Sequence, residues 1–286
     1  MNTTTIKAGA VEPGARGPAA GRPETRAQWL CLPREHGSWG MLLFPFVSGA
    51  VLAGSVNVWL LPALLAALAV FLIREPIVVL WRGRPDRTAA WRTLFLTGGT
   101  LAVSGLWLLA VLPLFWLSVL GGAAVVLTLV YVRAVVHGRQ RAIPLQIVGA
   151  AGLTSSVALA YLAGGRQPDF TLLLLWVSQT VYYTGSVLKI HALIEARKQR
   201  AGTVADDKRK RGAMIWLAVQ ITCALAFCVG GYWLMGAALS VPALVHGFDL
   251  RHMNDPSRRK TRLRTIGFRE LGLSTVFSVL AVLSLW

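Results

Sequence analysis

The stretch from Pro33 to Phe46, PREHGSWGMLLFPF, places three ionisable residues and a glycine directly before a long apolar run. Arg34, Glu35 and His36 stand at the predicted start of a helix. Trp39 follows at the depth where tryptophan prefers the boundary between lipid and water. The stretch therefore marks the point at which the chain leaves water, and it predicts a first helix that enters a membrane.

The rest of the chain is more apolar than an ordinary soluble domain. Of its 286 residues, 55% are hydrophobic and 14% are charged, and the apolar residues form long unbroken blocks. Its net charge of +17 raises the question of nucleic-acid binding. However, the basic residues cluster in loops beside apolar spans, which is typical of the cytoplasmic face of a membrane protein. We therefore expect membrane lipids as partners and no nucleic acid.

Nine apolar segments approach the length that a membrane-crossing helix needs. The sequence thus predicts an all-α, polytopic membrane helix bundle over residues 29–286, preceded by a disordered basic tail at residues 1–28. Two connections, at residues 57–58 and 112–113, are so short that they predict tight antiparallel hairpins. The nine predicted spans are residues 39–56, 59–80, 94–110, 113–134, 144–163, 170–193, 214–230, 232–247 and 268–286.

The charges of the loops predict the orientation of this bundle. Basic residues occupy the tail and every second loop, while the loops between them are nearly bare, with Arg166 as the exception. Because cytoplasmic loops collect Lys and Arg, the N-terminus is predicted to lie inside and Trp286 outside.

The string Arg74-Glu75-Pro76 in the second span is the first candidate site. A charge at the centre of the hydrocarbon costs about 2.5–3.5 kcal/mol on insertion scales, so such residues usually face a cavity or each other. Pro76 lacks a backbone N–H and would loosen the helix here. The alternative is that the span ends at Ile73 and that both charges lie at the interface.

A polar stripe in the sixth span is the second candidate. Its members recur at spacings of three, four and three, so they share one face of a helix. A polar stripe that ends in a lysine predicts the wall of a polar cavity that opens to the cytoplasm. The alternative is interhelical hydrogen bonding, with the lysine reaching the interface. The stripe consists of Gln179, Tyr182, Ser186 and Lys189.

Further candidates are carboxylates and one histidine. Glu35 beside His36 indicates proton handling, because histidine titrates near neutrality, although a carboxylate at a helix start is also favoured by the helix dipole. Glu270 lies on a polar face of the last span, together with serines four and eight residues later. The catalytic candidates are therefore Glu35, His36, Glu75 and Glu270. We expect no metal site, because the three cysteines form no CxxC pair and the chain has no HExxH motif.

Three strings of this sequence resemble the YwiC-like family of bacterial integral membrane proteins. They are the pattern (basic)-E-H-G-x-W-x-M-L-x-x-P-F at residues 34–46, LIREP at residues 72–76 and TIGFRE at residues 265–270. The resemblance extends from about Leu32 to the C-terminus. It implies a multi-pass protein of the bacterial inner membrane.

The plan of nine helices with polar clusters in the second and sixth spans also resembles the UbiA-type intramembrane prenyltransferases. In that superfamily, aspartate-rich motifs at these two places bind magnesium and a prenyl diphosphate. Here Arg74-Glu75-Pro76 and Lys189 stand where the aspartates would be expected. Isolated carboxylates cannot form a dimetal clamp for a diphosphate. Cationic side chains could instead hold an anionic head directly.

The sequence therefore predicts a cytoplasm-facing intramembrane cavity for an anionic amphipathic ligand, either a lipid or an isoprenoid, in a divergent prenyltransferase-like protein. The catalytic candidates would orient the ligand contacts or move protons. No cofactor is predicted. The alternatives are a small-anion transporter or permease and a non-catalytic membrane scaffold. The predicted ligand contacts are Arg34, Arg74, Gln179, Tyr182, Ser186 and Lys189.

Overall fold

The computed structural model describes residues 29–31, 36–83, 87–139, 142–199, 207–253 and 263–286. Within these ranges the chain is helical apart from short connections, and it contains no strand. The predicted tail at residues 1–28 lies outside the described residues. The helices are α1 (His36–Ala53), α2 (Leu60–Trp81), α3 (Arg87–Leu108), α4 (Leu114–Val136), α5 (Ile143–Thr154), α6 (Ser156–Ala163), α7 (Phe170–Gln199), α8 (Asp207–Val229), α9 (Trp233–Arg251) and α10 (Leu263–Leu285).

Each of the nine predicted spans corresponds to one helix, or in one case to a pair of helices. The pair is α5 and α6, which together cover the predicted span 144–163 and meet at Ser155. Ser155 keeps right-handed helical dihedrals, with φ −63° and ψ −11°. The fifth span is therefore bent at this residue and not unwound.

Six of the described segments are long and apolar enough to cross a membrane, which confirms the predicted helical membrane bundle. They are Leu60–Trp81, Leu114–Val136, Ile143–Ala163, Lys208–Val229, Trp233–Arg251 and Thr265–Leu285. Helix α1 is apolar but shorter, whereas α3 has Arg87 and Arg92 among its first six residues and α7 carries the polar stripe. Since a backbone in hydrocarbon must satisfy its own hydrogen bonds, long apolar runs in this setting fold as helices.

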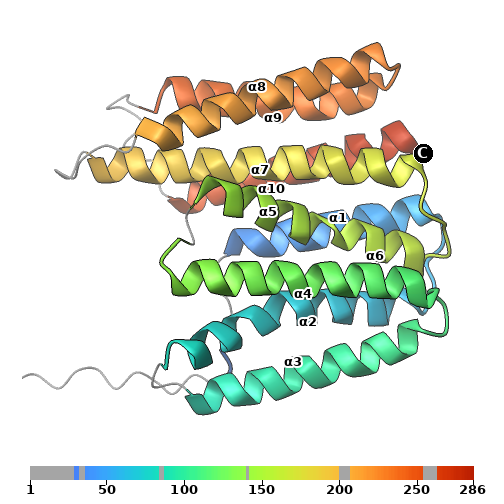
Figure 1. Cartoon of the computed structure of the whole chain (residues 1–286). Coiled ribbons are helices and arrows are strands. Elements are labelled where there is room, and N and C mark those ends of the chain that lie inside the picture. Colours follow the sequence, from blue (N-terminus) through green and yellow to red (C-terminus); the bar gives the residue numbers. More distant parts are fainter. Residues whose placement is uncertain (1–28, 32–35, 84–86, 140–141, 200–206, 254–262) are drawn as a thin grey trace, which may run out of the picture.

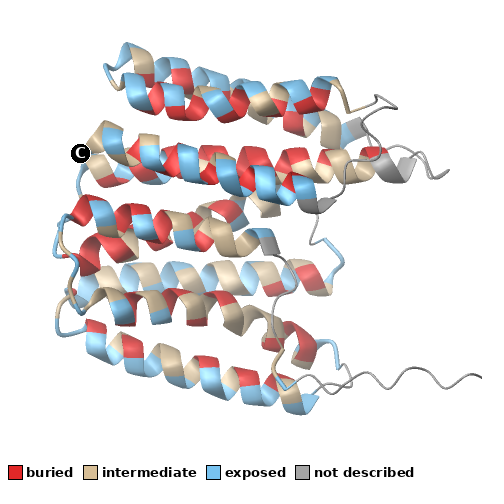
Figure 2. Cartoon of the chain, turned by 180° about the vertical axis from the view of Figure 1, so that it is seen from behind, coloured by how far each residue is buried: buried red, intermediate tan, exposed pale blue. Residues whose placement is uncertain are grey.

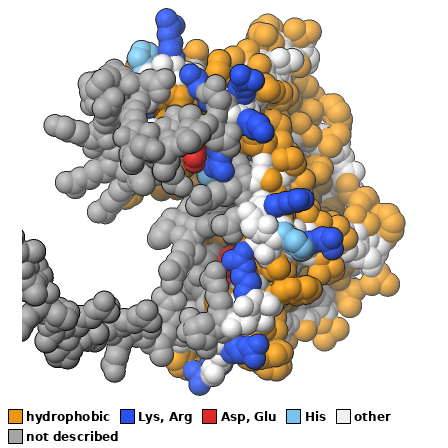
Figure 3. Space-filling view, turned by 60° about the vertical axis from the view of Figure 1, so that its left-hand side comes forward, with side chains coloured by type: hydrophobic (Ala, Val, Ile, Leu, Met, Phe, Trp, Pro, Cys, Tyr) orange, Lys and Arg blue, Asp and Glu red, His pale blue; other side chains and the backbone are white. Residues whose placement is uncertain are grey.

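The helices run side by side along one direction, so their ends form two opposite faces of the bundle (Figure 1). One face contains the first residues of α1, α3, α5, α8 and α10. The same face contains the last residues of α2, α4, α7 and α9. We call this face the basic end, because Lys and Arg side chains surround it whereas apolar side chains cover the flanks (Figure 3). The C-terminal Trp286 lies at the opposite end. This separation of charge is what the predicted orientation requires, and the orientation itself stays a prediction.

The charged residues of the opposite end have structural contacts. Asp169 accepts hydrogen bonds from the backbone N–H of Leu172 at 2.9 Å and from the hydroxyl of Tyr161 at 2.8 Å, so it caps the start of α7. The Arg166 side chain donates to the carbonyl oxygen of Ala53 at 3.4 Å, where α1 ends. These contacts account for two charges that interrupt the otherwise bare loops.

Helix α7 lies at the centre of the C-terminal half. It packs against α8, α9 and α10, and also against α1, α5 and α6 of the N-terminal half. Between Ser178 and Lys189 none of its residues is exposed, while the outer helices carry exposed side chains along their lengths (Figure 2). Side chains of this segment are therefore held away from lipid by protein.

The two short connections do not produce packed hairpins, so that prediction was wrong. Helix α1 packs mainly on α6 and α10, and α4 packs on α2 and α5 without a substantial contact to α3. The α1–α6 contact is close at Gly49, where a Cβ atom would collide with the carbonyl oxygen of Val157. In a membrane such close approaches between small residues select the packing partners, and chain proximity does not.

Candidate functional site

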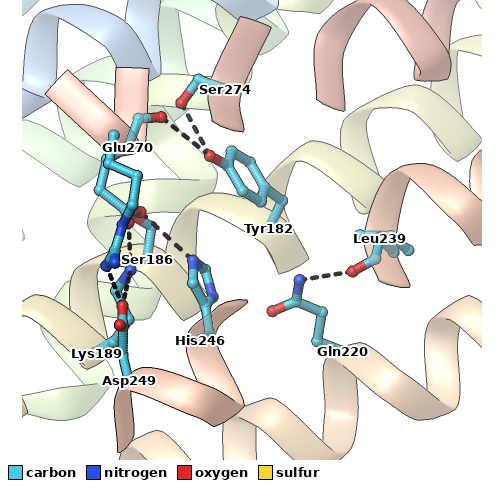
Figure 4. Close-up of polar contacts among 10 residues, drawn as sticks. Tyr182, Ser186, Lys189, Gln220, Leu239, His246, Asp249, Glu270 and Ser274 are labelled. Carbon is cyan, nitrogen blue, oxygen red and sulfur yellow. Dashed lines mark hydrogen bonds and ion pairs between the residues drawn. The ribbon is translucent and has the colours of Figure 1, made fainter. Parts of the chain in front are cut away.

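Helices α7, α9 and α10 bury a cluster of charged and polar side chains near the basic end. Its centre is the ammonium group of Lys189 on α7, whose side chain is 1% exposed. Lys189 is ion-paired with Glu270 of α10, and its Nζ lies 3.5 Å from Oδ2 of Asp249 on α9. Two carboxylates from two helices therefore converge on one lysine (Figure 4).

Glu270 has further partners on both sides. Its Oε2 accepts a hydrogen bond from the hydroxyl of Ser186 at 2.6 Å and lies 3.4 Å from Nε2 of His246. One turn later on α10, Ser274 shares a 3.0 Å hydrogen bond with the hydroxyl of Tyr182. The polar face of α10 thus packs against the polar stripe of α7.

Asp249 connects this buried cluster to the surface. It forms a second ion pair with Arg269, whose side chain is 42% exposed, whereas the Asp249 side chain is 7% exposed. The cluster then contains two cations, Lys189 and Arg269, and two anions, Asp249 and Glu270. Their charges balance when His246 is neutral, which limits the cost of burying them.

On the other side of His246, Gly185 of α7 allows side chains of α8 and α9 to approach closely. A Cβ atom on Gly185 would meet Oε1 of Gln220 at 2.8 Å and Nδ1 of His246 at 3.7 Å. Gln220, on α8, donates from Nε2 to the carbonyl oxygen of Leu239 at 3.0 Å, so its Oε1 is the atom that faces Gly185. Among the described residues, neither Gln220 Oε1 nor His246 Nδ1 has a hydrogen-bond partner.

A separate apolar cavity of about 190 Å³ lies among α1, α2, α3, α4, α5 and α6. Its wall is made by leucine, alanine, valine and glycine side chains, with Thr128, Ser155 and Ser156 as small polar residues. Arg74 is the charged residue of this lining. The guanidinium carbon of Arg74 lies 4.5 Å from the ring centroid of Phe71 and 4.9 Å from that of Tyr131.

Arg74 sits at one end of this cavity. Helix α2 continues through Pro76 to Trp81, so the helix itself does not end at Ile73, and the depth of Arg74 and Glu75 in the membrane stays a prediction. Arg74 lies seven residues before the end of α2, which is about 10 Å along the axis. Among the lining residues of α2 and α4, Arg74 and Tyr131 are the nearest to the basic end.

The predicted site residues therefore fall into two places. The α7–α9–α10 cluster contains Tyr182, Ser186, Lys189 and Glu270, which form interhelical hydrogen bonds, but Lys189 is buried and does not reach the interface as that alternative expected. Arg74 instead lines the cavity of the N-terminal half, whose lining includes no residue of α7. The described residues thus do not bring Arg74 and Lys189 to one ligand head.

The remaining predicted residues are less informative. Arg34 and Glu35 lie outside the described residues, and the side chain of His36 is not described. Glu75 is half-buried in α2. Gln179 is fully buried on α7, and within the described part of the chain neither polar atom of its side chain has a hydrogen-bond partner.

Sequence reasoning did not assign His246, Asp249 and Gln220 to the site. The first two are three residues apart on α9, so they share a helix face, and this spacing could have been noticed in the sequence. Gln220 is a single amide inside an apolar span, and only the packing of α8 against α7 and α9 gives it a role.

Comparisons with known proteins concern mainly the half of the chain that contains the cavity. Residues 32–161 match the family described as YwiC-like protein. The chain is also similar to the Uncharacterized protein YwiC of Bacillus subtilis (strain 168), with 23% identity over 170 residues, which are 59% of this chain and 70% of that relative. The match to the family contains Arg74 and nearly all of α1–α6, while α7–α10 follow it along the chain.

Proposed function

We propose a function for the half of this helical membrane bundle that matches the YwiC-like family over residues 32–161, in agreement with the resemblance of its opening string. This half binds one anionic amphipathic molecule, a lipid or an isoprenoid. The apolar tail occupies the cavity among α1–α6, and Arg74 contacts the anionic head. The observation that carries the proposal is an apolar cavity with a single charged side chain at the end nearest to the basic face.

The energetics of Arg74 favour an anion at this position. A guanidinium inside the hydrocarbon costs about 2.5–3.5 kcal/mol on insertion scales. Stacking on two aromatic rings returns about 0.5–2 kcal/mol. A phosphate or carboxylate would supply charge-assisted, bidentate hydrogen bonds to the guanidinium, and these are stronger than neutral ones. An anionic head is therefore a ligand that the guanidinium of Arg74 is chemically suited to bind.

Glycines give the cavity its space. Gly105, Gly121 and Gly149 line it, and a Cβ atom on any of them would meet nothing within 4 Å. Gly122 is the neighbour of Gly121 on α4, would also have open space around an added Cβ, and is not part of the lining. The pair therefore offers a filled cavity and a matched control one residue away.

Native mass spectrometry of the purified full chain tests the proposal. The wild type should carry a discrete bound mass that Gly121→Leu removes and Gly122→Leu retains. Arg74→Gln should lower occupancy at least tenfold, because it removes the charge and leaves the apolar wall unchanged. Equal loss in both glycine variants, or no bound mass in the wild type, would overturn it. Magnesium-dependent prenyl transfer would contradict a head held by arginine alone.

A small-anion transporter is the second candidate. The observation in its favour is the division of the fifth span into α5 and α6 at Ser155, a residue that lines the cavity, since transporters often build their sites where a span is divided into two helices. Uptake of a labelled small anion into vesicles that contain the protein would support it. A non-catalytic scaffold instead predicts that charge-neutral changes at Arg74 and Lys189 leave cells unaffected.

A further inference from the structure

The cluster of α7, α9 and α10 contains an imidazole between two oxygen acceptors. On one side, Nε2 of His246 lies 3.4 Å from the carboxylate oxygen Oε2 of Glu270. On the other side, Nδ1 and the amide oxygen Oε1 of Gln220 both lie near Gly185, and among the described residues neither ring nitrogen of His246 has a hydrogen-bond partner. His246 is 2% exposed, so water at the surface of the bundle does not replace these partners.

A neutral imidazole can satisfy only one of these acceptors, because it carries one N–H and one lone pair. An imidazolium carries two N–H groups and can donate to both. The orientation of Gln220 is fixed by its hydrogen bond to the carbonyl oxygen of Leu239, which can only accept. Both oxygens therefore stay acceptors, beside a ring whose two nitrogens have no hydrogen-bond partner among the described residues.

We propose that His246, held between Glu270 and Gln220, is a proton-binding site in the interior of the bundle. This assignment does not depend on the lipid-binding proposal, because no residue of the site lines the apolar cavity. The ligand is a proton delivered by water. An O–H bond of a hydronium ion breaks and its electron pair stays on the oxygen of a neutral water molecule, while the imidazole lone pair forms the new N–H bond and the site gains one positive charge.

The charges around His246 distinguish a proton from a metal ion. From α10 it faces Glu270, from α7 it faces Lys189 and Tyr182, and along α9 it lies near Asp249. The ammonium of Lys189 already occupies the place between the two carboxylates where a metal cation would bind. On the side of His246 that lies near Gly185, the neighbouring residue of α8 is the uncharged Gln220. The nearby chain of Lys189, Asp249 and the partly exposed Arg269 leads from this site towards the surface.

Nuclear magnetic resonance of the full chain in lipid nanodiscs, with ¹⁵N-labelled histidine rings, tests this site. The titrant is the proton itself, from about pH 5 to pH 9, a window centred on the ordinary range of histidine. The resonance of His246 is identified by its loss in His246→Gln. If that variant does not fold, elimination with single Gln variants of the other four histidines gives the same assignment.

The expected result is that His246 gains a proton within this window. Glu270→Gln and Gln220→Leu should each weaken its proton binding about tenfold, because the first removes the neighbouring negative charge and the second removes the amide oxygen. The exposed His137, directly after the C-terminal end of α4, is the internal control, and its ring resonances should be the same in all variants at every pH. A His246 that keeps one neutral tautomer over the whole window overturns the proposal. Unchanged titration in both variants would overturn it as well.

Discussion

Removing the charge of Glu270 should expose how strongly the buried cluster holds α7 and α10 together. Breaking a buried, hydrogen-bonded ion pair by changing one partner costs about 3–5 kcal/mol, because the other charge is left uncompensated. For Glu270→Gln, Lys189 keeps Asp249 at 3.5 Å, so the lower end, about 3 kcal/mol, is expected. Lys189→Met leaves two buried carboxylates with fewer cations and should cost at least as much.

The double variant Lys189→Met/Glu270→Gln should cost no more than either single change. It removes one cation and one anion, and the ion pair of Asp249 with Arg269 stays intact. The coupling energy of the double-mutant cycle is then about 3 kcal/mol or more. The assay is equilibrium unfolding of the full chain in mixed detergent micelles, followed by tryptophan fluorescence.

An additive double variant, with a loss of about 6 kcal/mol, would refute this reasoning, because it would mean that the two charges act independently. Single losses below about 1 kcal/mol, the usual value for exposed pairs, would refute it too. The pair of Glu195 and Arg209 is the matched control, since its atoms are 3.8 Å apart and both side chains are 20% exposed. Glu195→Gln should therefore change stability by less than about 1 kcal/mol.

Three further predictions use the same unfolding assay or a fusion reporter. Gly185→Ala should destabilise the protein by about 1–3 kcal/mol, since the new Cβ displaces the buried amide of Gln220. As a control, Gly98→Ala should be neutral or stabilise by up to about 1 kcal/mol, because a Cβ there meets nothing within 4 Å. Equal effects of the two changes would contradict the close approach at Gly185. Asp169→Ala should cost about 1 kcal/mol because the N–H of Leu172 loses its cap, and an unchanged free energy of unfolding would show that the cap is dispensable. Alkaline phosphatase fused after Trp286 should be active if the C-terminus lies outside, as the loop charges predict, and an inactive fusion at full expression would reverse the orientation.

The positions of the helices follow from the sequence because each apolar run must satisfy its own backbone in lipid. The predicted spans agree with the observed helices best at their apolar ends. They are too short where charged residues continue a helix into water, as in α7, which runs to Gln199, and α8, which starts at Asp207. Lysine, arginine and glutamate favour helices but leave no apolar signal, so these extensions were not predicted.

Packing partners could not be read from hydropathy, since lipid and protein interiors are equally apolar. This explains why α1 was expected beside α2 but packs on α6 and α10. Helical spacing did place Tyr182, Ser186 and Lys189 on one face and Glu270 on another polar face. Helical spacing does not encode the tertiary contacts that bring these two faces together. It also does not encode the contacts that place Arg74 in a different half of the bundle.

The sparse packing of α4 has a consequence for how a ligand would arrive. Helix α4 forms one wall of the cavity and is held mainly by α2 and α5. No hydrophobic force opposes its separation in a bilayer, because lipid tails replace the lost contacts. A molecule dissolved among the acyl chains can therefore enter sideways, between α4 and its neighbours, without first passing through the aqueous phase. Short-chain detergents would use the same route, so purification in them is expected to exchange the native occupant.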